Sequence, residues 1–151
     1  MSAYCTPTEA GLDGMLAMVV GEAAKASPNE GATIQASHHA VFIDRDGVPV
    51  ATCSCNLTAA ANLGCALSMI PPGGAEAMIE ERALSETANA NFYEVMNIFS
   101  SLLMDDRSGH LRLSEVGAGA APVPLEDGRS TSFTLDLDRY GKGGEIVFRH
   151  V

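Results

Sequence analysis

Glu94 and Asn97 are the two residues whose types and spacing are best suited to carry chemistry in this sequence. Residues three apart on a helix have Cβ atoms about 5–6 Å from each other, so both side chains could meet one external ligand or protein. Ala90 and Ser101 continue the same ridge at four-residue steps, and their small side chains would let a partner approach closely. The alternative interpretation is that Glu94 and Asn97 are solvated polar residues on the outer face of an amphipathic helix.

The helix that would carry this ridge is the clearest element of the sequence. Ser85 is a good N-cap, and apolar residues then recur at three- and four-residue steps to about Met104. The sequence therefore predicts a long central helix over 85–104 with one buried face. Glu86 and Asn89 repeat the Glu-x-x-Asn spacing near its start, where we interpret them as surface residues.

Hydrophobic periodicity, capping residues and turn residues predict the elements around this helix. The expected helices cover 8–26, 72–80 and 85–104. The expected strands cover 33–43, 48–57, 63–70, 110–116, 132–140 and 145–151. Turns or loops are expected at 44–47, 105–109, 117–129 and 141–144, and residues 59–62 separate two of the expected strands. The alanine-rich run 63–70 fits a strand or a helix by periodicity alone, and we favour the strand.

The order of these elements indicates the fold class. Strands and helices do not alternate as repeated βαβ units, which argues against a doubly wound parallel sheet. The sequence therefore predicts an α+β fold, in which a largely antiparallel sheet packs against two or three helices and the helix over 85–104 is central.

Composition excludes several classes of function. The 151 residues are about one domain in length, and 46% hydrophobic residues are enough to bury one core. A net charge of −10 disfavours nucleic acid as a partner, because it repels a phosphate backbone. No apolar stretch approaches the ~20 residues that a bilayer requires, so we expect a cytoplasmic protein without membrane insertion.

The cysteines and histidines do not form a recognisable metal site. Cys5, Cys53, Cys55 and Cys65 lack the second pair that closes a zinc site, and we expect free thiols, with Cys53 and Cys55 on one face of a strand. His38 and His39 are adjacent in an expected strand, so their side chains would face opposite sides. No metal site is expected in this chain.

Three segments, 63–71, 75–81 and 91–103, resemble the core of the CheC/CheX/FliY superfamily of bacterial chemotaxis phosphatases, and most closely its CheX-like branch. In the third segment Glu94 and Asn97 form the Glu-x-x-Asn pattern of that family, followed by Ile98 and by small or apolar residues. The likeness covers roughly residues 60 to 116.

The resemblance implies a single CheX-like domain over 1–151 that acts as a hydrolase in two-component signalling. Its substrate would be the phospho-aspartate of a CheY-type response regulator. Asn97 would hydrogen-bond the attacking water, and Glu94 would pair with the active-site lysine of the regulator. The chain would need no cofactor of its own, because Mg²⁺ is expected in the regulator's active site. CheX-like relatives form dimers through their sheets, so a homodimer is also expected.

Two positions depart from the family pattern and favour a second hypothesis. Ala90 stands where many members have Ser or Asp, and Ala120 stands where many have proline, with Pro122 two residues later. The second hypothesis is a non-catalytic interaction or adaptor domain of the same fold, which would bind a response regulator or a switch component.

Overall fold

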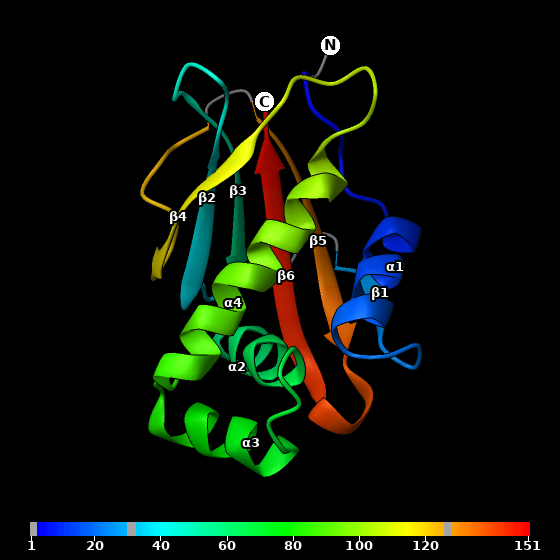
Figure 1. The fold of residues 1–151 in the computed structure, drawn as a ribbon, viewed down its shortest axis with the longest axis vertical. Coiled ribbons are helices and arrows are strands. Elements are labelled where there is room, and N and C mark those ends of the chain that lie inside the picture. The colour runs from blue at the N-terminus through cyan, green and yellow to red at the C-terminus, as the bar shows by residue number, and fades with distance from the viewer. Residues whose placement is uncertain (1–2, 30–32, 126–127) are drawn as a thin grey trace.

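A six-stranded antiparallel sheet is the framework of the molecule (Figure 1). The computed structural model describes residues 3–29, 33–125 and 128–151. The strands are β1 (Lys25–Pro28), β2 (His38–Ile43), β3 (Pro49–Cys55), β4 (Arg112–Ala118), β5 (Arg129–Asp136) and β6 (Lys142–His150). They lie in the order β1-β5-β6-β3-β2-β4, and every neighbouring pair is antiparallel.

Helices pack on this sheet, with α2 and α4 in front of it in the view of Figure 1. The helices are α1 (Glu9–Val19), α2 (Leu57–Ala66), α3 (Pro72–Glu81) and α4 (Glu86–Phe99), with short 3-10 segments η1 (Ser100–Leu103) and η2 (Asp138–Tyr140). Thr8 and Ser85 cap α1 and α4 as expected, because their side chains accept hydrogen bonds from the backbone N–H groups of Gly11 and Ala88.

One cluster of buried side chains joins the sheet to the helices. Phe99 of α4 and Phe133 of β5 both contact the ring of Phe148 on β6, with ring centroids 6.3 Å and 6.4 Å away. Phe42 of β2 and Phe92 of α4 are also fully buried. The expected α+β class with a largely antiparallel sheet is therefore confirmed, and α4 lies over its middle (Figure 1). The described residues form four α-helices rather than the two or three expected, because the run predicted as a strand is helix α2.

Both predicted hairpins are present. The turn between β2 and β3 is closed by a hydrogen bond from the N–H of Asp44 to the carbonyl of Val48. Gly47 has a φ of +80° in this turn, a conformation that glycine adopts without steric cost. The final hairpin pairs β5 with β6, but its turn comes earlier than expected, because the segment from Lys142 onward already belongs to β6.

The first helix was predicted to run too far. It ends at Val19, and Lys25–Pro28 forms strand β1 instead of a last helical turn. Gly21, with a φ of +146°, redirects the chain after the helix. The N–H of Ala26 then donates to the Asp13 carboxylate at 2.7 Å, which holds β1 against α1.

The prediction of a strand over 63–70 was wrong, and residues 59–62 do not separate two strands. Both stretches fall largely within α2, which begins after the N-cap Asn56. The eight residues from Ala59 to Ala66 are all buried, because α2 lies between α4 and β6. A helix buried on all sides has no polar face, so it lacks the amphipathic periodicity that distinguishes helices from strands.

The remaining differences concern boundaries. The strand expected over 33–43 begins at His38, and β4 extends to Ala118 into the expected loop over 117–129. Residues 126 and 127 of that loop lie outside the described residues. The long helix becomes a 3-10 turn at Ser100, so its last residues, through Leu103, are wound more tightly than an α-helix.

Candidate functional site

Helix α4 is anchored firmly along its inner face. Ala88, Phe92, Val95, Met96 and Phe99 are completely buried in the core. The position of the helix along α2 is fixed by Asn91, whose amide nitrogen donates to the carbonyl of Gly64 at 2.8 Å and to the Ser68 hydroxyl at 2.6 Å. The outer face of α4 is therefore a rigid support.

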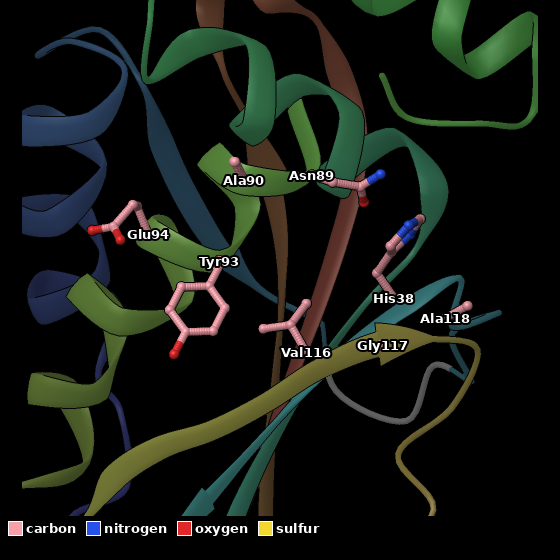
Figure 2. Close-up of a pocket in the computed structure, with 8 residues that line it drawn as sticks. All are labelled: His38, Asn89, Ala90, Tyr93, Glu94, Val116, Gly117 and Ala118. Carbon is pink, nitrogen blue, oxygen red and sulfur yellow. The ribbon is translucent and has the colours of Figure 1, made fainter. Parts of the chain in front are cut away.

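The outer face carries the predicted ridge. Ala90, Glu94, Asn97 and Ser101 are all exposed, on the side of α4 opposite its buried residues. The carboxylate of Glu94 points away from β4 in Figure 2. Ser101 falls in η1 rather than in the α-helix, where its hydroxyl donates to the carbonyl of Ile98 at 3.0 Å and contacts the Met15 sulfur at 4.0 Å. We call these four residues the α4 ridge.

Neither polar side chain at the centre of the ridge is used by the fold. Among the described residues, the side chains of Glu94 and Asn97 have no hydrogen-bond or ion-pair partner. The backbone carbonyl of Asn97, unlike its side chain, accepts a hydrogen bond from the Ser100 hydroxyl at 2.6 Å. Both functional groups are therefore available to an external partner, at the cost of displacing water alone.

A groove of about 680 Å³ runs along one flank of the ridge, between α4 and β4 (Figure 2). We call it the α4–β4 groove. It is lined by His38, Asn89, Ala90, Tyr93, Glu94, Val116, Gly117 and Ala118. Since Ala90 and Glu94 belong to both the ridge and the groove, the two features form one continuous surface. Sequence reasoning did not predict this groove.

His38 forms one end of the groove and is half-buried there. Its ring meets the edge of Phe92 at 5.6 Å between centroids, and its Nδ1 lies 2.9 Å from the Ser37 hydroxyl. Burial, and secondarily the neighbouring His39, lower the pKa of His38 below its ordinary value of 6.5. At neutral pH the groove therefore presents a neutral imidazole that can still form hydrogen bonds.

The two adjacent histidines face opposite sides of the sheet, as predicted. His39 is buried on the side away from α4, where its Nδ1 lies 3.0 Å from the carbonyl oxygen of Gly119. Its ring occupies the space beside Gly117, where an added Cβ would come within 2.9 Å of it. His39 therefore has a structural role, whereas His38 borders the candidate site.

The four cysteines are free thiols, as expected. Cys53 and Cys55 are buried on the core side of β3, and Cys65 is buried in α2. Burial, together with the adjacent Cys55, raises the pKa of the Cys53 thiol well above its ordinary value. Within the described ranges, no group of three or more His, Cys, Asp or Glu residues is placed to hold a metal ion.

Sequence reasoning found the ridge but missed its surroundings. Tyr93 precedes Glu94 and lies toward β4, so a helical projection could have placed it beside the ridge. The part of the groove formed by β2 and β4 depends on the pairing of His38 with Ala118, which are eighty residues apart and which no local pattern connects.

Comparisons with protein-family models, with curated proteins and with solved structures found no match to this chain. None of the helices in the described part of the chain combines the length and the hydrophobicity needed to cross a membrane.

Proposed function

We propose that this chain is a CheC/CheX-like domain that removes the phosphoryl group from the phospho-aspartate of a CheY-type response regulator. The observation that carries the proposal is the state of Glu94 and Asn97. They lie on the exposed face of a core-anchored helix and make no side-chain hydrogen bond to any described residue. The sequence around them has the family's Glu-x-x-Asn pattern.

The proposed reaction requires little from the phosphatase. An acyl phosphate is hydrolysed when a water attacks phosphorus and the aspartate carboxylate leaves. Catalysis of such a transfer consists mainly of positioning and electrostatic stabilisation. The metal ion and the lysine that neutralise the phosphoryl group would belong to the regulator, so the phosphatase must chiefly place the water in line.

The two side chains of the ridge suit the two parts of this task. The carboxamide of Asn97 can accept a hydrogen bond from the attacking water and remains neutral at any physiological pH. The carboxylate of Glu94 can form a charge-assisted hydrogen bond with the regulator's lysine, which would set the register of the helix in the pocket. The small side chain of Ala90 leaves space beside Glu94 for that approach.

The second candidate is a non-catalytic adaptor that binds a response regulator or a switch component through the same ridge. The observation that favours it is Ala90, which supplies no polar group one turn before Glu94. In that case the surface would recognise a regulator without orienting water.

Phosphate release separates the two candidates. The protein is mixed with a panel of phosphorylated receiver domains from its own host, and inorganic phosphate is followed with time. The phosphatase proposal predicts faster release from at least one receiver, and loss of that acceleration in Asn97→Ala. Thr87→Ala, which removes an exposed polar side chain near the start of the same helix, is the control and should behave as wild type. Binding without release by wild-type protein would favour the adaptor.

A further inference from the structure

The α4–β4 groove adjoins the surface that a partner covering Glu94 would contact. Ala90 and Glu94 line the groove and also form half of the α4 ridge. A regulator that placed its lysine on Glu94 would therefore cover at least the near wall of the groove. Protein interfaces of standard size bury about 800 Å² on each partner, which is more than two ridge side chains can supply.

Tyr93 is the residue of this surface best suited to anchor a partner. The residue is 42% exposed, whereas the other tyrosines and phenylalanines of the described chain are buried, and its ring points toward β4 in Figure 2. Its hydroxyl makes no hydrogen bond to any described residue. Tyrosines of this kind combine apolar contact area with a polar tip, and they are enriched among the residues that dominate binding energy.

The chemistry of the groove indicates what enters it. Val116 and Ala118 supply apolar side chains, and His38 is neutral at physiological pH because its pKa is lowered by burial. Of the eight residues that line the groove, Glu94 is the one with a formal charge. An anionic phosphoryl group would be repelled, whereas an uncharged side chain beside a cation matches this surface.

We infer that the receiver domain of the regulator docks on the ridge and the groove together, and that it places in the groove an uncharged, largely apolar segment adjacent to its active-site lysine, with Tyr93 as the main anchor. This inference rests on the proposed function, because it takes the regulator as the partner. The argument for this occupant is continuity: Ala90 and Glu94 belong to both the ridge and the lining of the groove, so a partner whose lysine met the outward-pointing Glu94 carboxylate would have its neighbouring segment beside the groove.

The test separates binding from turnover. Affinity is measured by calorimetry against a receiver domain activated with beryllofluoride, and turnover by phosphate release at varied receiver concentration. Tyr93→Ala removes the anchor, and Ala118→Arg puts a long cation into the groove at an exposed position. Each is expected to weaken binding about tenfold or more and to raise KM while kcat is retained. The matched controls are Met69→Ala, in the loop before α3, and Ala77→Arg, on α3, and both positions are exposed.

The other possible results of this test would overturn the docking inference, the phosphatase proposal or both. Wild-type affinity and KM in both groove variants, with active wild-type protein, would overturn the docking inference and leave the phosphatase proposal standing. Loss of binding in both variants, with a wild-type protein that binds but releases no phosphate, would overturn the phosphatase proposal alone. If Ala118→Arg instead converts a dimer to a monomer with unchanged affinity, the groove holds a second copy and the inference is wrong. A wild-type protein that binds no receiver would overturn both.

Discussion

In the proposed function, Glu94 and Asn97 would have different chemical tasks although they share one face of α4. Glu94 carries a charge, so its contribution should appear mainly in the affinity for the partner and in the dependence of that affinity on salt. Asn97 carries no charge, so its contribution should appear mainly in the rate of the chemical step. Because neither side chain is held by the described fold, substituting them should leave stability nearly unchanged.

Glu94→Gln tests the charge at the residue scale. Removing the charge while keeping the shape is expected to weaken regulator binding about tenfold and to flatten its dependence on ionic strength. Binding is measured by calorimetry at low and at high salt. Glu80→Gln removes an exposed carboxylate from α3 and serves as the control. An unchanged salt dependence in Glu94→Gln would show that Glu94 does not meet a cation on the partner.

His38 should make stability depend on pH. Burial lowers the pKa of His38 in the folded protein below the value of 6.5 that an unperturbed histidine has. The unfolded chain therefore binds more protons than the folded chain as the pH falls through this range. Above about pH 7.5, protonation of His38 therefore has no effect on the free energy of unfolding. As the pH falls below about 6.5, it lowers the free energy of unfolding, until the folded histidine is also protonated.

Urea denaturation of His38→Gln between about pH 7.5 and about pH 5 measures this contribution. The variant is expected to lose less stability on acidification than wild type, because residue 38 no longer titrates. The control is His110→Gln, since His110 is exposed. Equal acid sensitivity in wild type and His38→Gln would contradict the assigned direction of the pKa shift.

At the scale of elements, the approach of α2 to α4 determines how the ridge is supported. A Cβ added to Gly64 of α2 would lie 2.7 Å from the backbone carbonyl oxygen of Ala88 on α4. Backbone atoms cannot move aside as the end of a side chain can, so this position requires glycine. The side chain of Asn91 on α4 donates to the Gly64 carbonyl on α2, so a hydrogen bond also joins the two helices at this point.

Gly64→Ala should therefore destabilise the protein by about 1–3 kcal/mol, since it overpacks a backbone contact. Gly14→Ala is the matched control, because a Cβ at this position of α1 would meet nothing within 4 Å. Gly14→Ala should instead stabilise by about 0.5–1 kcal/mol through the better helix propensity of alanine. Chemical denaturation measures both, and a neutral Gly64→Ala would contradict the described packing of α2 on α4.

A helix or strand could be predicted where its capping residues, turn residues and hydrophobic periodicity all lie within one stretch of the sequence. The helix from Ser85, with Phe92 and Phe99 on its buried face, and the turn at Gly47 have local signals, and these predictions were confirmed. Helix α2 was missed because it is buried on all sides. Its N-cap Asn56 also hydrogen-bonds β6, accepting from the N–H of Glu145 at 2.9 Å, a contact that no local pattern contains.

The same distinction applies to the candidate site, whose ridge could be predicted from the sequence and whose groove could not. The exposure of Glu94 and Asn97 follows from the periodicity of a single helix, so the sequence alone could place both residues on one face. The groove requires β4 to be at the edge of the sheet, with His38 opposite Ala118. That register is a property of the assembled sheet, and the pattern of either strand alone cannot determine it.

At the scale of the whole molecule, the proposed docking surface belongs to an acidic protein. The net charge of −10 would repel an acidic regulator at long range. In the proposed complex, binding would therefore depend on close contacts at the ridge, where a lysine could meet Glu94, and in the groove. This surface is presented by a helix that the core holds along its whole length, so binding need not order it first.

The single-turnover rate of phosphate loss from a phosphorylated receiver domain tests the central claim most directly. It is measured with saturating wild-type protein and with saturating Asn97→Ala, after calorimetry has shown that both bind the activated receiver with similar affinity. The proposal predicts that Asn97→Ala lowers the rate about a hundredfold, because water is bound but no longer aligned. Equal rates for the two proteins, with equal binding, would contradict the claim that Asn97 positions the attacking water.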